Sequence, residues 1–205
     1  MPTRGDVRDT FERIAEHFAE TRHHPWPEVE AFLEGRDGSL GLDLGCGNGR
    51  HAALLAERTD RVLALDASRA LLGAARERCP TAGFVQADAA TSPVATDAVA
   101  LALYVATLHH LPSDAARRAS LDDLARALAP GAPALVSAWS TAADRFDDPA
   151  SGERTVDWTL PGGETVPRYY FVFAPGDFDA LLADSDLTVE RTWVSSGNCY
   201  AVVKG

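Results

Sequence analysis

The sequence is nearly without lysine. Its 205 residues contain one lysine, Lys204, beside eighteen arginines, and 30 acidic residues outnumber the 19 basic ones to give a net charge of −11. At ordinary salt such a chain repels phosphates, so its overall charge disfavours a nucleic-acid partner. The same composition is typical of halophile proteins, which we take as a hypothesis. In about 1 M salt the screening length is only ~3 Å, so local arginine contacts would decide binding there.

Long apolar runs and paired cysteines are also missing. No stretch approaches the roughly 18 consecutive apolar residues of a membrane span, and the segment after Met1 lacks the apolar region of a signal peptide. Cys46, Cys79 and Cys199 lack the C-x-x-C spacing of a zinc site and are too few for a disulfide scaffold. We therefore expect a cytoplasmic protein with one domain over residues 1–205, without membrane contact or a metal of its own.

The hydrophobic pattern predicts an N-terminal helical arm at residues 1–36, followed by alternating strands and helices. The arm contains a helix over 6–20 and a short helix after Pro27. From Leu40 onward, the alternation is typical of parallel strands joined by right-handed crossovers. The expected strands are 40–44, 62–65, 83–87, 97–105 and 132–138, and the expected helices are 49–58, 68–78 and 113–128, with Ser68 and Ser113 as N-caps.

Residues 140–168 interrupt this alternation with many Asp, Gly, Pro and Thr residues and little periodicity. A long insertion at the side where strands end favours a role in substrate binding. After it, the pattern predicts a helix at 176–184 and strands at 187–194 and 199–203. Because only a few residues separate these two strands, we expect them to pair as an antiparallel hairpin.

The strongest motif is a glycine-rich loop between the first strand and the next helix. Its sequence is Leu42-Asp-Leu-Gly-Cys-Gly-Asn-Gly-Arg, and glycine is needed where a backbone turns sharply and approaches a ligand closely. Arg50 stands where a dinucleotide-binding fingerprint has its third glycine, which disfavours NAD. The expected cofactor contacts in this loop are Asp43, Gly45, Cys46, Gly47, Asn48 and Gly49, with Cys46 present as a small residue and not as a nucleophile.

An acidic residue follows each of the next two strands. Asp66 can accept two hydrogen bonds from a ribose diol, and Asp88 can accept one from an adenine amino group. Either acid alone could be an ordinary solvated carboxylate, but their positions after the glycine loop favour ligand binding. Their neighbours Ala67 and Ala89 are included among the expected cofactor contacts.

These motifs resemble those of class I S-adenosylmethionine-dependent methyltransferases. The resemblance implies an α/β, Rossmann-like fold with a seven-stranded, mostly parallel sheet, an antiparallel last strand and helices on both faces. It also implies S-adenosyl-L-methionine as the cofactor and adds Tyr104 to the expected contacts. Trp26 is a further candidate because an aromatic ring attracts a sulfonium cation, although it could instead wedge the arm onto the core.

A narrower resemblance covers nearly the whole chain. Four segments, Thr21-Arg-His-His-Pro-Trp-Pro, Thr107-Leu-His-His-Leu, Arg168-Tyr-Tyr and Ser196-Gly-Asn-Cys-Tyr, are similar to those of the wobble-uridine tRNA carboxymethyl methyltransferases. That family converts the carboxylate of 5-carboxymethyluridine in the tRNA anticodon loop into a methyl ester, together with a small zinc-binding activator subunit. The resemblance implies a heterodimer in which the activator covers an edge strand at 83–87.

Five residues of these segments are candidates for a catalytic role. We expect Arg22 and Arg168 to hold the substrate carboxylate through paired hydrogen bonds, with Tyr169, His109 or His110 completing the site. The arginines could instead be solvated surface charges, and a lone histidine at a strand end is more often structural. Because a carboxylate is already ionised at pH 7, the reaction needs alignment and no general base.

Two other functions stay open at this level. One is a small-molecule methyltransferase with the same cofactor fold, for which the tRNA of a strain lacking the gene would be unchanged. The other is a catalytically silent methyltransferase-like scaffold that binds a partner. The intact glycine loop and both acids disfavour the scaffold.

Overall fold

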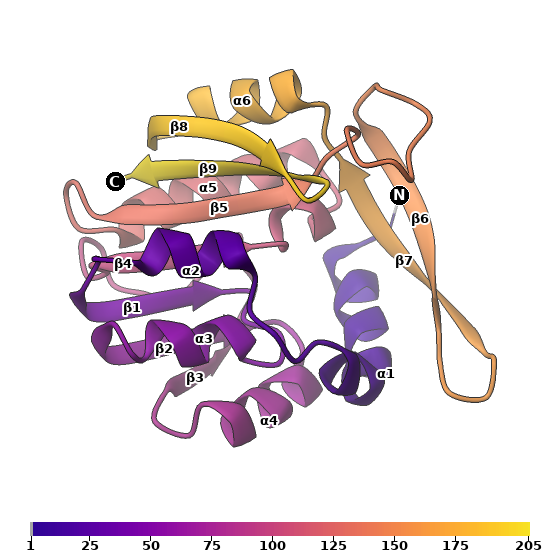
Figure 1. Cartoon of the computed structure of the whole chain (residues 1–205), viewed down its shortest axis with the longest axis horizontal. Coiled ribbons are helices and arrows are strands. Elements are labelled where there is room, and N and C mark those ends of the chain that lie inside the picture. Colours follow the sequence, from indigo (N-terminus) through magenta and orange to yellow (C-terminus); the bar gives the residue numbers. More distant parts are fainter. Residues whose placement is uncertain (1) are drawn as a thin grey trace.

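The computed structural model describes residues 2–205, so Met1 of the predicted arm lies outside the described residues (Figure 1). The strands of the main sheet are β1 (Gly38–Leu44), β2 (Thr59–Asp66), β3 (Gly83–Gln86), β4 (Leu101–Val105), β5 (Pro133–Trp139), β8 (Thr188–Ser195) and β9 (Asn198–Lys204). They form a 7-stranded sheet in the order β3-β2-β1-β4-β5-β9-β8, and only β9 runs antiparallel to its neighbours. The predicted fold class is therefore confirmed, and β3 is an edge strand as expected.

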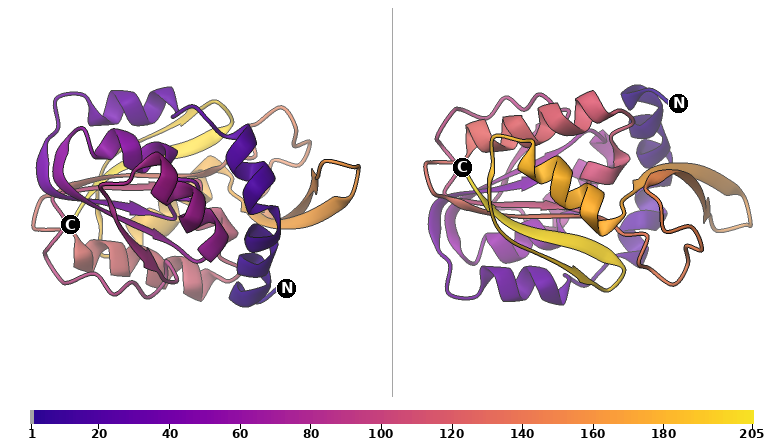
Figure 2. Two further views of the ribbon diagram at one scale, coloured as in Figure 1. Left: turned by 90° about the horizontal axis from the view of Figure 1, so that it is seen from below. Right: turned by 90° about the horizontal axis from the view of Figure 1, so that it is seen from above.

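Helices cover both faces of this sheet. The helices are α1 (Arg4–Thr21), α2 (Pro27–Leu33), α3 (Arg50–Leu55), α4 (Arg69–Arg78), α5 (Asp114–Ala127) and α6 (Pro175–Ala183). Figure 2 shows α2, α3 and α4 on one face, with α5 and α6 on the other. Phe32 and Leu72 belong to the buried apolar cluster of the first face, and Leu124 and Phe178 to that of the second. The parallel strands are thus buried on both faces.

Local capping sets several of the predicted boundaries. The hydroxyl of Ser68 accepts a hydrogen bond from the backbone N–H of Leu71 at 3.2 Å, and Ser113 caps α5 in the same way, as predicted. The strand predicted at 97–105 begins only at Leu101, because the chain turns with a φ of 56° at Asp97. Among residues 2–205, no helix combines the length and the apolar character needed to cross a membrane.

Much of the insertion at 140–168 belongs to a β-hairpin, which was not predicted from the sequence. β6 (Gly152–Thr159) pairs antiparallel with β7 (Thr165–Val172) in a separate 2-stranded sheet that projects beside α1 in Figure 1. Alternate side chains of β7 are buried, but Arg168 is one of them. A buried arginine breaks the alternation of apolar and polar residues by which such a strand is recognised.

Candidate active site

A cavity of about 470 Å³ lies at the carboxyl ends of the parallel strands, where α1 and β7 face the main sheet. Ligands of open α/β sheets bind in this crevice. The predicted site residues that line the cavity are Arg22, Trp26, Gly45, Gly47, Asp66, Ala67, Asp88, Ala89, His109, His110 and Arg168. The tertiary structure therefore brings the arm, the glycine loop, the two acids and the hairpin to one place.

Two glycines of the loop are required for different reasons. Gly45 and Gly47 have φ values of 78° and 52°, which L side chains rarely adopt. A Cβ added to Gly45 would also lie 2.1 Å from Oγ1 of Thr107, so the loop packs directly against the segment that follows β4. At Gly47 such a Cβ would lie 3.6 Å from its nearest neighbour in Phe18, so there the backbone conformation alone requires glycine.

Asp66 is fixed in place by the backbone around it. Its Oδ2 accepts a hydrogen bond from the N–H of Gly47 at 2.8 Å, and its Oδ1 accepts one from the N–H of Ser68 at 2.8 Å. Burial raises the pKa of Asp66 to about 6, although these backbone donors oppose the rise. Each carboxylate oxygen retains a lone pair for another donor, which fits the predicted contact with a ribose diol.

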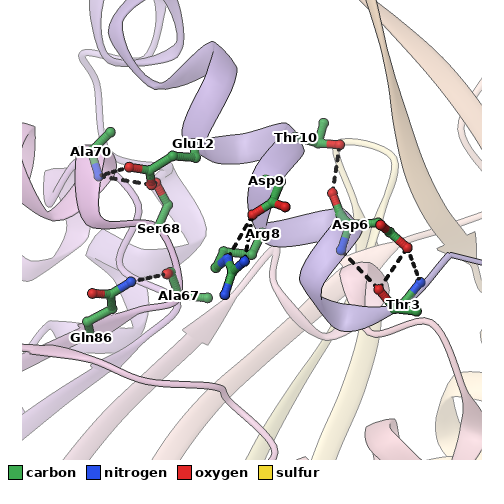
Figure 3. A network of polar contacts seen from close by, with 10 residues as sticks. All are labelled: Thr3, Asp6, Arg8, Asp9, Thr10, Glu12, Ala67, Ser68, Ala70 and Gln86. Carbon is green, nitrogen blue, oxygen red and sulfur yellow. Dashed lines mark hydrogen bonds and ion pairs between the residues drawn. The ribbon is translucent and has the colours of Figure 1, made fainter.

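The N-terminal helix α1 is anchored across the cofactor end of the cavity (Figure 3). The Glu12 carboxylate accepts hydrogen bonds from the Ser68 hydroxyl at 2.6 Å and from the backbone N–H of Ala70 at 3.1 Å. Near the start of the helix, Arg4 forms an ion pair of 3.0 Å with Asp88. Such an exposed pair contributes only ~0–1 kcal/mol, so an adenine amino group could replace Arg4. Nothing in the sequence signalled the role of Glu12.

Five predicted cofactor contacts do not line the cavity: Asp43, Cys46, Asn48, Gly49 and Tyr104. Tyr104 is the clear correction, because its fully buried side chain points toward α5 and its hydroxyl is 2.5 Å from the hydroxyl of Ser120. Burial raises the pKa of the Cys46 thiol, which suits a small packing residue. Asp43 is buried at the end of β1, and burial together with the charge of Asp66 raises its pKa to about 7.

Asn48 joins the glycine loop to the arm. Its side-chain Nδ2 donates hydrogen bonds to the backbone carbonyls of Ala19 at 3.3 Å and Arg22 at 2.8 Å. The guanidinium of Arg78 donates a further hydrogen bond to the Arg22 carbonyl at 3.0 Å. Asn48 is thus a positioning residue that fixes where the arm turns into the cavity.

The two histidines after β4 hold their protons on different ring nitrogens. Nδ1 of His109 accepts a hydrogen bond from the backbone N–H of Trp139 at 2.9 Å, so its proton must be on Nε2. Nδ1 of His110 is 3.1 Å from the backbone carbonyl of Tyr169, which can only accept, so His110 carries its proton on Nδ1. Burial lowers the pKa of both rings, that of His110 to about 3, and keeps them neutral. The pair therefore offers one Nε2 donor and one Nε2 acceptor.

Arg22 and Arg168 come from distant segments and contact the same aromatic ring. Their guanidinium carbons lie 5.1 Å and 4.6 Å from the centroid of Trp158, on strand β6. The Trp158 indole is itself fixed by a hydrogen bond of 3.1 Å from Nε1 to Nδ1 of His17. Burial and the nearby charges of Arg22 and Arg145 lower the pKa of Arg168.

Tyr170, and not the predicted Tyr169, faces the cavity. Tyr169 does not line the cavity, and its hydroxyl donates a hydrogen bond to the Pro112 carbonyl at 3.3 Å. Tyr170 lines the cavity instead and stacks on Trp139 with ring centroids 3.9 Å apart and an interplanar angle of 5°. Neighbouring residues of a strand point to opposite faces, so only one tyrosine of the pair can face the cavity.

Comparisons with known proteins agree with this arrangement. Residues 42–131 match the model of a family described as methyltransferase domain. The chain is 36% identical over 135 residues to the tRNA (carboxymethyluridine(34)-5-O)-methyltransferase ALKBH8 of Macaca fascicularis, an alignment that covers 65% of this chain and 20% of that protein. It is 26% identical over 200 residues to the tRNA (carboxymethyluridine(34)-5-O)-methyltransferase of Schizosaccharomyces pombe, with 86% of each chain covered.

Several of these relatives are much longer than this chain, which spans 20% of the macaque protein and 39% of the one from Arabidopsis thaliana. Solved structures share the fold. The DhpI-SAM-HEP complex is 23% identical over 100% of both chains, with a TM-score of 0.75. A methyltransferase in complex with the Haloferax volcanii Trm112 methyltransferase activator is 16% identical, with a TM-score of 0.68 over 97% of this chain and 96% of that one.

Proposed function

Because this chain belongs to the class I S-adenosylmethionine-dependent methyltransferases, we propose that it methylates the carboxylate of a 5-carboxymethyl-type wobble uridine in tRNA. The observation that carries the proposal is the convergence of Arg22 and Arg168 on Trp158. Two guanidinium groups on one ring, at the wall of a cofactor cavity, suit a planar anion that must be held in a fixed orientation.

The charges of the cavity support an anionic substrate. Arg22, Arg50, Arg145 and Arg168 all line it, and in residues 2–205 none of the four forms an ion pair with a carboxylate. Each lies over an aromatic ring instead. Four arginines without a carboxylate partner leave positive charge at the wall of the cavity, which would attract an anionic ligand. A carboxylated base flanked by phosphates is such a ligand.

The residues present fit S-adenosylmethionine. Asp66 is fixed by two backbone donors and keeps lone pairs for a ribose, and Gly47 leaves the loop backbone open to a ligand. When bound, this cofactor supplies an electrophilic methyl group on a sulfonium. The volume of about 470 Å³ lies within the range of small-molecule sites.

The proposed step needs no proton transfer. Bound S-adenosylmethionine would supply the methyl group, and an ionised carboxylate of the substrate would accept it through one oxygen without first losing a proton. Arg22 and Arg168 orient the carboxylate, and Nε2–H of His109 is a further donor for its second oxygen. His109 is a neutral donor, which limits the stabilisation of the charged ground state, because a clamp that binds this state too strongly raises the barrier.

The partner that we propose is a small zinc-binding activator subunit that covers β3. This strand is the edge of the main sheet, with Phe84 and Val85 only partly buried. Uncovered edge strands associate readily, and a strand or loop of another chain can pair with them. The structural likeness to a methyltransferase solved with the Trm112 activator supports this choice.

A reconstituted reaction tests the proposed function. The chain, co-purified with an activator, is incubated with S-adenosylmethionine and an anticodon stem-loop RNA that carries 5-carboxymethyluridine. Mass spectrometry should detect a methyl ester on this RNA and none on a control RNA with unmodified uridine. In parallel, tRNA from a strain lacking the gene should lose the ester. Unchanged tRNA in that strain would instead support a small-molecule substrate.

A further inference from the structure

Two residues of β9 present buried polar atoms to the cavity without a hydrogen-bond partner. Asn198 is 6% exposed and Tyr200 is fully buried, and both line the cavity. In the described structure, Oδ1 of Asn198 and the hydroxyl of Tyr200 have no partner. Because the two residues are two positions apart on one strand, their side chains lie on the same face. Buried polar groups are normally satisfied, so these two suggest a ligand.

The chemical character of each atom follows from its surroundings. Nδ2 of Asn198 donates a hydrogen bond to the Ser196 carbonyl at 3.0 Å, which fixes the amide so that Oδ1 is a free acceptor. Burial and the Glu28 carboxylate raise the pKa of Tyr200, so its phenol stays protonated and can donate. Oε1 of Glu28 accepts hydrogen bonds from the hydroxyls of Ser195 at 2.7 Å and Ser196 at 3.0 Å. The Glu28 carboxylate lies beside the Tyr200 phenol, so a ligand carbonyl would compete with Glu28 for this donor.

Oδ1 of Asn198 and the hydroxyl of Tyr200 lie on the side of the cavity away from the proposed cofactor contacts. The proposed cofactor contacts, Asp66 and Asp88, follow β2 and β3 on one side of the glycine loop, whereas β9 lies on the other side, beyond β4 and β5. Asn198 pairs in register with Trp139 at the end of β5. A base whose substituent faces the transferable methyl group would therefore turn one of its edges toward β9.

We propose that Asn198 and Tyr200 recognise the N3–H and a neighbouring carbonyl of the substrate's uracil ring, and so select uridine over cytidine. This inference rests on the proposed function. Uracil presents a donor at N3 beside carbonyl acceptors, which matches an acceptor next to a donor in the protein. Cytosine presents the opposite pair, an acceptor at N3 and an amino donor at C4, so Oδ1 of Asn198 would face a lone pair.

The test compares two anticodon stem-loop RNAs that carry 5-carboxymethyluridine or 5-carboxymethylcytidine at the wobble position. Methyl-ester formation on each is measured in competition, with the co-purified wild-type protein and the variants Asn198→Ala and Tyr200→Phe. Wild-type protein should prefer the uridine RNA. Asn198→Ala should lower that preference at least about tenfold, because it removes both the bond to N3–H and the repulsion of cytosine. Tyr200→Phe should lower it as well.

Controls separate this inference from the proposed function. Thr192→Ala, on the exposed surface of the same β8–β9 hairpin, should keep the wild-type preference. Calorimetry should show unchanged S-adenosylmethionine affinity in Asn198→Ala. If the variant loses that affinity, Asn198 contacts the cofactor and the inference is wrong. If Asn198→Ala keeps the wild-type preference, the inference is also wrong. If the wild-type protein methylates neither RNA, the proposed function itself fails.

Discussion

Asp43 offers a quantitative test of the electrostatics beneath the glycine loop. Its side chain is 2% exposed, its Oδ2 has no partner within the described residues, and its pKa is raised to about 7 by burial and by the charge of Asp66. In the unfolded chain, Asp43 should ionise near ~3.9. Asp43→Asn keeps the shape of the side chain and removes the titration.

The direction in which the free energy of unfolding changes with pH follows from the number of protons bound in the folded and unfolded states. Between pH ~3.9 and about 7, the folded chain holds the Asp43 proton and the unfolded chain does not, so this group makes the free energy of unfolding fall as pH rises. Above about 7 both states are ionised, and the penalty is constant. Between pH ~3.9 and about 7, each rise of one pH unit lowers the free energy of unfolding by about 1.4 kcal/mol. From pH 5.5 to 7, the Asn variant should therefore gain about 2 kcal/mol relative to wild type.

Urea unfolding followed by tryptophan fluorescence at several pH values from 5.5 to 8.5 gives this difference directly. Using the difference between variant and wild type cancels the titration of acids that do not interact with Asp43. Asp66 interacts with Asp43 electrostatically, so the difference reports the titration of this pair. Thr192→Ala, which alters an exposed side chain without a titrating group, should show a difference that does not change with pH. An equally flat curve for Asp43→Asn would show that the Asp43 carboxyl is not destabilised by burial, and would refute the reasoning.

Three further outcomes are expected. Asp66→Ala should abolish most S-adenosylmethionine binding while the fold persists, and calorimetry with undiminished affinity would contradict its assignment. Arg22→Ala and Arg168→Ala should each lower methyl-ester formation by at least about tenfold at unchanged cofactor affinity, since the Arg22 carbonyl that Asn48 holds is retained. Arg191→Ala, which removes an arginine from Trp193 outside the cavity, is the matched control. The chain expressed alone should be aggregated or inactive by size-exclusion chromatography and assay, and full activity as a monodisperse monomer would count against the activator.

The sequence was sufficient for several features that local patterns encode. The spacing of the glycine loop and the acids after successive strands predicted residues that line the cavity together, since the carboxyl ends of parallel strands meet at one edge of a sheet. The caps at Ser68 and Ser113 and the antiparallel β8–β9 hairpin were predicted for the same reason, because they depend on residues close together in the chain.

Only the tertiary structure decided contacts between distant segments. The packing of β7 against α1 and β5 turned Tyr170, and not Tyr169, toward the cavity, and no local pattern in a strand with a buried arginine predicts that orientation. The orientation of β4 likewise turned Tyr104 toward α5 and away from the cavity. Arg22 and Arg168 lie over the same ring because the N-terminal arm packs against the hairpin that carries Trp158, and such packing depends on the complete fold.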